Sequence, residues 1–178
     1  MPVIKYTTMP EGSKKGRKHT ISMKVNHNFN ALARIAGLFT GRGFNIDSIS
    51  IGEAEEDKMA SCTITTHGDE RIIDQITLQL DKLVDVISVQ DLTFTPHVER
   101  ELALVKVVSS KEKQTEIIQV ANVFRAKVID ISQESLTIEI TGRKDKVDAA
   151  IGMFEPFGLR QIARTGTVAM KREYQPKD

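Results

Sequence analysis

The sequence predicts an α+β fold built from two tandem ferredoxin-like βαββαβ units. Apolar residues recur with helical spacing in four segments, and short alternating or fully apolar segments typical of β-strands lie between them. The order strand, helix, strand, strand, helix, strand occurs twice, and Pro96 separates the two copies. We therefore expect a solvated basic tail at residues 1–18, a first unit at 19–95 and a second unit at 96–178.

The first unit begins with a strand at residues 21–25, where apolar and polar side chains alternate. Strands are also expected near 45–52, 59–66 and 84–94, with an acidic turn at 53–57. Each of the two helices has one apolar face. The residues on these faces are Leu32, Ile35, Ala36 and Phe39 in the first helix and Ile72, Ile76, Leu80 and Leu83 in the second. Gly41 and Gly43 are expected to end the first helix.

The second unit begins with an apolar strand at residues 102–108, and the pair Ser109 and Glu112 predicts a capping box at the start of the next helix. Further strands are expected at 127–131, 136–140 and 159–163, with an extension at 167–170. The helical positions that predict buried faces are Ile117, Val120, Ala121 and Phe124 in one helix and Val147, Ala150, Ile151 and Phe154 in the other, which Pro156 and Gly158 stop.

The composition is that of an ordinary globular protein. The 178 residues are 40% hydrophobic and 28% charged, and the net charge of +1 provides no strong field for nucleic acid or anionic membranes. We find no apolar run long enough to span a membrane and no signal-peptide pattern. The single cysteine, Cys62, excludes an intramolecular disulfide and a CxxC metal site. We expect a cytoplasmic protein.

The sequence carries no recognisable catalytic constellation, and we expect the chain to have no catalytic site, metal site or cofactor of its own. The four histidines are scattered, and Cys62 lies in the middle of a predicted strand. The glycines at 41 and 43 end a helix instead of opening one, so they do not form a dinucleotide-binding loop. Aromatic residues make up 5% of the chain, and the predicted central strands offer none on which bases could stack.

A candidate anion site lies at the start of the first predicted helix. Backbone N–H groups from Asn28 to Ala31 could hold a carboxylate there, because the positive end of the helix dipole favours a negative charge. Asn45 opens the next strand, which we expect close beside this turn, and its amide has both a donor and an acceptor. Ile46 would limit the size of a bound side chain. The alternative is purely structural: Asn30 as a helix N-cap and Asn45 as a turn residue.

Three stretches of the sequence resemble the regulatory (small) subunit of acetohydroxyacid synthase, also called acetolactate synthase. The resemblance covers residues 19–172. The second and third stretches are the runs Lys82–Val89 and His97–Val107. The first stretch lies within residues 27–52, and its matching residues are Leu32, Arg34, Gly37, Leu38, Phe39, Arg42, Gly43, Phe44, Asn45, Ile46 and Ser48.

The resemblance implies an ACT domain at residues 19–95, responsible for effector binding and dimerisation, and a C-terminal ferredoxin-like domain at 96–178. It implies a homodimer and a partner, the catalytic large subunit, that holds thiamine diphosphate, Mg²⁺ and FAD. It also implies feedback inhibition by valine, bound between two ACT domains by the turn before the first helix and by Asn45. The residues it assigns to this site are His27, Asn28, Phe29, Asn30, Ala31, Asn45 and Ile46.

One part of the predicted site departs from the family pattern. The family has Glu-Asn-x-Pro-Gly-x-Leu, or a close variant, where this chain has His27 in place of the asparagine and Asn30 in place of the glycine. Asparagine tolerates left-handed backbone better than most residues, so the turn can persist, with an added side chain in the pocket. Two other functions are compatible with the sequence: a stand-alone amino-acid-binding ACT module that regulates a different enzyme or a transcription factor, and a nucleic-acid binder that uses the basic tail.

Overall fold

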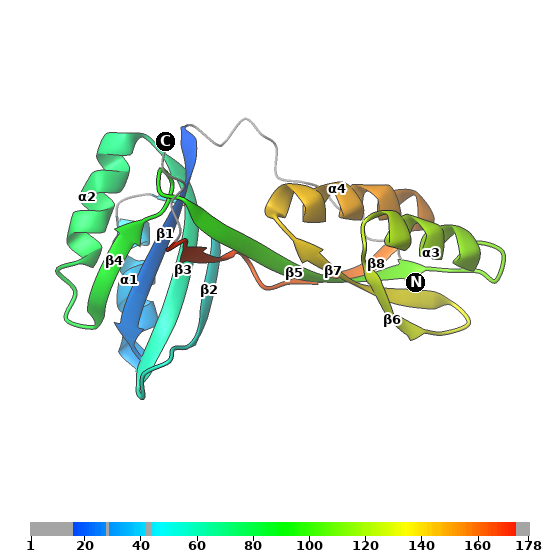
Figure 1. The fold of residues 1–178 in the computed structure, drawn as a ribbon, viewed down its shortest axis with the longest axis horizontal. Helices are drawn as coiled ribbons and strands as arrows, with labels where there is room; N and C mark the ends of the chain where they lie inside the picture. The colour runs from blue at the N-terminus through cyan, green and yellow to red at the C-terminus, as the bar shows by residue number, and fades with distance from the viewer. Residues whose placement is uncertain (1–15, 28, 42–43, 174–178) are drawn as a thin grey trace. The chain divides into compact units, whose positions relative to one another are not determined.

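The predicted fold class is confirmed. The computed structural model describes residues 16–27, 29–41 and 44–173, and Figure 1 shows two sheets, each with its own pair of helices. The chain divides into two compact units. One, here called the first unit, contains the described residues up to Glu99 together with residues 167–173, and the second unit contains Arg100–Gly166.

The first unit has a four-stranded antiparallel sheet, the first sheet, in the order β2-β3-β1-β4, with both helices on one face. Alternate residues of β1 and β3 point to that face and form the core with one side of each helix. The elements are β1 (Arg17–Asn26), α1 (Phe29–Gly41), β2 (Ile46–Glu53), β3 (Met59–Gly68), α2 (Glu70–Leu80) and β4 (Val86–Asp91). The core residues are Ile21, Met23, Val25, Ile35, Phe39, Ala60, Cys62, Ile64, Ile73, Ile76 and Leu80.

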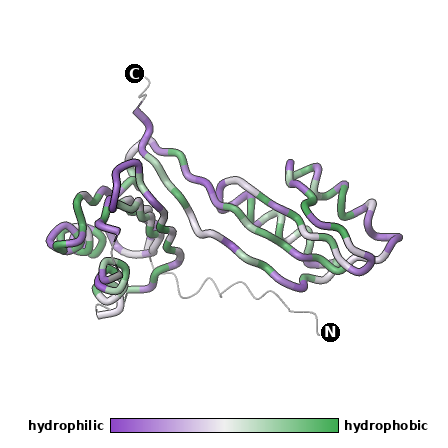
Figure 2. Tube along the Cα trace, turned by 90° about the horizontal axis from the view of Figure 1, so that it is seen from below, coloured by the Kyte–Doolittle hydropathy of each residue, from purple (hydrophilic) through white to green (hydrophobic). Residues whose placement is uncertain are grey.

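The second unit repeats this topology, with strand order β6-β7-β5-β8 and its helices on one face of the second sheet. Alternate residues of β5 and β7 point to that face and are buried there, and Figure 2 shows hydrophobic residues, in green, along the strands. The elements are β5 (His97–Val108), α3 (Gln114–Val123), β6 (Lys127–Ile131), β7 (Ser135–Gly142), α4 (Lys144–Phe154) and β8 (Leu159–Arg164), followed by β9 (Val168–Lys171).

The structure differs from the sequence prediction at several boundaries. Strand β1 begins at Arg17, so the end of the expected tail is part of the sheet, while residues 1–15 lie outside the described part of the chain. The predicted capping box is wrong: α3 begins at Gln114, and the Ser109 hydroxyl donates instead to the carbonyl of Ser110 at 3.2 Å. The buried face of α2 contains Ile73 where Ile72 was expected.

The last strand lies apart from the unit in which the sequence placed it. We expected residues 167–170 to extend the second unit, but β9 pairs with β5 and packs against β1 and β3 of the first unit. Figure 1 shows β9, in dark red, on the side of the first sheet away from α1 and α2. Its backbone N–H at Ala169 donates to the hydroxyl of Thr63 at 3.2 Å. The C-terminal strand therefore completes the first unit from a distant part of the sequence.

An ion-pair network joins three elements of the second unit. The Arg164 guanidinium on β8 makes two bonds to the buried Glu101 carboxylate on β5, at 2.6 and 2.9 Å, and one to Asp148 on α4 at 2.8 Å. Burial opposes the charge of Arg164, but the two carboxylates outweigh it and raise the pKa of the guanidinium. Burial likewise opposes the charge of Asp148, and Lys144 and Arg164 lower the pKa of that carboxyl. The network fixes α4 to the edge of the second sheet.

The core of the second unit can be tested at two neighbouring positions of α4. Phe154 is fully buried, whereas Met153 is 52% exposed. Phe154→Ala is expected to lower the free energy of unfolding by about 3–5 kcal/mol, because it removes an aromatic ring and leaves a cavity. The control Met153→Ala should change it by less than about 0.5 kcal/mol. Urea unfolding followed by circular dichroism measures both, and equal effects would contradict the assigned helix face.

Candidate ligand-binding site

The turn between β1 and α1 is held from two sides. The backbone N–H of Asn26 donates to the Asp85 carbonyl at 2.8 Å, and that of His27 donates to the Lys58 carbonyl at 2.7 Å. Lys58 has a φ of 63°, a left-handed conformation at the end of the β2–β3 turn. The side chain of His27 is exposed. The described part of the chain includes neither Asn28 nor the side chain of Phe29. The described backbone therefore fixes where the turn enters the helix.

The first turn of α1 combines an exposed asparagine with a buried alanine. Asn30 is exposed at the helix surface, and Ala31 is buried. A ligand that reached this helix end would meet the backbone of Ala31 and not its methyl group. One turn further on, an Arg34 guanidinium nitrogen lies 3.3 Å from a carboxylate oxygen of the buried Asp85. This ion pair ties α1 to the loop before β4.

The pair of Arg34 and Asp85 was not predicted from the sequence. Both residues lie in stretches that carry the family resemblance, Arg34 in the first and Asp85 in the run 82–89. Their opposite charges were the available signal, but nothing in the local sequence indicates that the loop before β4 returns to the start of α1. The strand register supplies that information, since β4 lies beside β1.

Asn45 and Ile46 lie at the opposite end of the first sheet from this turn, which corrects the expectation that they lie close beside it. Asn26 pairs with Met59 on β3, whereas Ile46 pairs with Thr66 of the same strand. These partners are seven residues apart on β3, a separation of about 23 Å at ~3.3 Å per residue. Within one chain the predicted site residues therefore form two groups, one at each end of α1.

The group around Asn45 is well anchored. The Asn45 side chain is exposed, while its carbonyl accepts a 2.7 Å bond from the hydroxyl of the buried Thr66. Ile46 is half-buried and packs against the core of the first unit. The register of β2 shifts between Ile46 and Ser48, so Asp47 forms a bulge, and its carboxylate bonds to Nδ1 of His67. A rigid backbone thus presents the Asn45 amide to solvent.

One edge of the first unit exposes aliphatic side chains. Strand β2 is the edge strand of the first sheet, and α1 directly precedes it in the chain. Leu32 on α1 is 40% exposed and Ile51 on β2 is 41% exposed. An unpaired strand edge with apolar neighbours is a surface suited to pairing with another chain.

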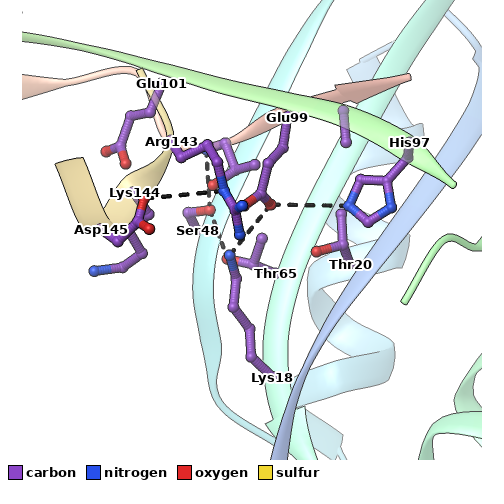
Figure 3. A network of polar contacts seen from close by, with 12 residues as sticks. Lys18, Thr20, Ser48, Thr65, His97, Glu99, Glu101, Arg143, Lys144 and Asp145 are labelled. Atoms are coloured by element: carbon purple, nitrogen blue, oxygen red, sulfur yellow. Dashed lines mark hydrogen bonds and ion pairs between the residues drawn. The ribbon is translucent and has the colours of Figure 1, made fainter. Parts of the chain in front are cut away.

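The side chains with catalytic potential are engaged elsewhere. Burial raises the pKa of the Cys62 thiol to about 11, so the nucleophilic thiolate is scarce at neutral pH. Of the histidines, His19 bonds to Asp91, His67 to Asp47, and His97 donates from Nδ1 to the Thr95 carbonyl at 2.7 Å. Figure 3 shows His97 facing Glu99, to which Lys18 also bonds at 3.4 Å. The acidic turn is paired with a lysine, since Lys24 bonds to Glu55 and Glu56.

The described residues contain neither a candidate metal site nor a membrane-spanning helix. In this part of the chain, no three His, Cys, Asp or Glu side chains gather in a way that could hold a metal ion. None of the described helices has the length and apolar character needed to cross a membrane.

The fold and this edge define the class of protein. A βαββαβ unit with an exposed turn before its first helix and a free β2 edge is typical of ACT domains, and the model of the AHAS small subunit-like ACT domain matches residues 21–88. The model of the small subunit of acetolactate synthase matches residues 100–173. Together the two models cover most of the chain.

Known proteins agree with both models. The acetolactate synthase small subunit of Aquifex aeolicus is 46% identical over 163 residues, which are 91% of this chain and 85% of that protein. The probable acetolactate synthase small subunit of Methanothermobacter thermautotrophicus is 48% identical over 155 residues, 86% of this chain and 92% of that protein. The crystal structure of the acetolactate synthase small subunit from Thermotoga maritima matches with a TM-score of 0.81 and 42% identity, covering 89% of this chain and 99% of that one. The chain belongs to the family of acetolactate synthase small subunits.

Proposed function

We propose that this chain is a non-catalytic regulatory subunit that binds the catalytic large subunit of acetolactate synthase, raises its activity and transmits feedback inhibition by valine or a related branched-chain amino acid. The observation that carries the proposal is the family match over both units, with relatives named as small subunits at 46% and 48% identity. In this proposal thiamine diphosphate, Mg²⁺ and FAD belong to the large subunit, and the complex works in the cytoplasm.

The positions of the predicted site residues support an effector site shared by two copies of the chain. His27–Ala31 and Asn45–Ile46 lie at opposite ends of the same α1/β2 edge. If two such edges meet about a two-fold axis, the helix start of one copy faces the β2 start of its partner, and the reverse contact forms at the other end. Each dimer then holds two equivalent sites, each complete only because the partner contributes half of it.

Such a site fits a small free amino acid. The carboxylate would lie at the backbone N–H groups of the α1 start, where the helix dipole favours a negative charge. The exposed Asn45 amide of the partner offers an acceptor for the ammonium group and a donor for the carboxylate. Ile46 would limit the effector side chain to a small aliphatic group.

The two other functions have less support. A stand-alone ACT module would not need the second unit, whose residues match the small-subunit model. A nucleic-acid reader of this topology would use the helix-free face of its sheet, and in the first unit β9 packs across that face.

The role of a non-catalytic activator has a direct test. The purified chain alone should form no acetolactate from pyruvate, and an equimolar mixture with the large subunit should turn over several-fold faster than the large subunit alone. A colorimetric acetolactate assay measures both. Product formation by this chain alone, or an unchanged rate in the mixture, would contradict the proposal.

The dimer should depend on the α1/β2 edge. Leu32→Asp places a charge in the apolar surface of this edge and should shift the chain from dimer to monomer at micromolar concentration. Leu78→Asp on α2 is the matched control, because Leu78 is 63% exposed and lies on the other helix. Sedimentation velocity distinguishes the two. If both variants remain dimers, the interface lies elsewhere. If the parent protein is a monomer, the proposed dimer does not exist.

The shared site can be tested at Asn30 and Asn45. Asn30→Gly removes a side chain that competes with the effector for space and should tighten valine binding by ~1 kcal/mol, about fivefold. Asn45→Ala removes a polar partner from a desolvated site and should weaken it. Asn122→Ala, an exposed position on α3, serves as control. Calorimetric titration with valine measures all three, and unchanged affinity in both site variants would place the effector site elsewhere.

Mixed dimers make this experiment specific for a site built from two chains. Asn30→Asp should repel the effector carboxylate, so neither Asn30→Asp nor Asn45→Ala homodimers should bind valine well. A mixed dimer of the two variants carries both substitutions in one site and none in the other, and should recover one strong site per dimer. No recovery after subunit exchange would contradict a shared site.

A further inference from the structure

We propose that strand β9 is a strap through which the effector site of the first unit controls the second unit, and that the hydroxyls of Ser48 and Thr63 are its attachment points. The inference rests on the proposed function above for the existence of an effector. It adds the path by which the effector would act.

The strap lies on a face of the first sheet that is lined with hydroxyl groups. On β1 and β3, the residues that point away from the helices include Thr20, Thr63 and Thr65, and these are only 1–4% exposed. A sheet face without helices would leave such side chains in water. Strand β9 covers them, because it packs against β1 and β3, and Ala169 is itself buried there.

The backbone of the strap pairs with β5, and two further hydrogen bonds hold it to hydroxyls of the first sheet. The Ala169 N–H donates to the Thr63 hydroxyl at 3.2 Å, and the Thr167 N–H donates to the Ser48 hydroxyl at 3.4 Å. Ser48 in turn shares a 2.7 Å hydrogen bond with Thr65 on the neighbouring strand, and Figure 3 shows the two side by side. Hydroxyls can exchange such a bond for one to water without being left unsatisfied. These two bonds can therefore be broken without leaving a hydroxyl unsatisfied.

Ser48 connects the strap to the candidate effector residues. It lies two positions after Ile46, and the bulge at Asp47 separates them. Because Asp47 is held by His67, a movement of the Asn45–Ile46 segment cannot be absorbed at the bulge without breaking that pair. The Ser48 hydroxyl, and with it the Thr167 N–H, is the next group along the strand to respond.

The strap is a direct continuation of the second unit. Only residues 165–167 separate the end of β8 from the start of β9, and the family model of the small subunit runs through both strands to residue 173. β9 also pairs with β5, most of which belongs to the second sheet. A change in how the strap is held therefore reaches β5 and β8 through the backbone. Regulation requires such a differential contact between two states of the protein.

The test uses the full-length chain and valine as the probe. Hydrogen–deuterium exchange of the segment 167–172 reads the strap directly, because the Ala169 N–H is one of its attachment bonds. Saturating valine should change the exchange rate of this segment several-fold in the parent protein and should not change it in Asn45→Ala. Valine binding with unchanged exchange would overturn the strap while leaving the effector site intact. Absence of valine binding to the parent protein would overturn the effector assignment and the strap together.

Substitution of the attachment points separates a regulatory role from a structural one. Thr63→Val keeps the buried shape and removes only the acceptor, and Ser48→Ala removes the second acceptor. With the large subunit present, both variants should activate normally and bind valine within twofold of the parent, while the valine concentration for half-inhibition rises at least fivefold. Ser61→Ala, an exposed position on β3, is the matched control and should behave as the parent. Unchanged inhibition in both strap variants would overturn the proposal.

Discussion

The site depends on one geometric constraint: α1 connects two strands that run parallel to each other on either side of β3. A helix that returns the chain to the start of the second strand must run antiparallel to both. With its 13 residues, α1 spans about 18–20 Å at ~1.5 Å per residue, so its start and the beginning of β2 are a sheet length apart. No local rearrangement of a single chain can bring these two polar ends together. Any ligand that needs both requires two chains.

A second consequence of the topology is that each sheet has helices on only one face. The first unit uses β9 to cover part of the other face, so it is not a continuous segment of the sequence. The residues under the strap are mostly serine and threonine instead of leucine or valine. An apolar face would bind the strap more tightly, but it would also make release costly, since exposed apolar area costs roughly 25 cal/mol per Å². A hydroxyl-lined face tolerates both the covered and the uncovered state, as a reversible contact requires.

Local patterns predicted most of the fold. The four apolar positions expected in α4 are all buried, and β6 has the bounds that the sequence predicted, because periodicity and turn residues report directly on these elements. The errors arise where a competing local contact or a distant partner decides. Ser109 bonds to the Ser110 carbonyl instead of capping α3, and β9 joins the first unit because its partners are β5 and the Thr63 hydroxyl, far away in the sequence.

The candidate site was predictable only in part, for the same reason. Residue types at the α1 start and at Asn45 predicted a polar site, and that site stays a prediction. The distance between the α1 start and Asn45 could not be predicted from the sequence, because it depends on the register of β3 against its two neighbouring strands. The ion pair of Arg34 with Asp85 was also hidden, since it joins residues 51 positions apart through the pairing of β4 with β1.

The departures from the family pattern fall on positions whose side chains are exposed. His27 and Asn30 are exposed, whereas Ala31, Ile35 and Phe39 on the same helix are buried in the core or against it. Substitution at the exposed positions therefore changes what a ligand meets without disturbing how α1 packs on the sheet. The buried stripe holds α1 on the sheet. In the effector site proposed above, the exposed turn could therefore change which ligand binds at little cost to stability, because packing and ligand contact would use different faces of the same helix.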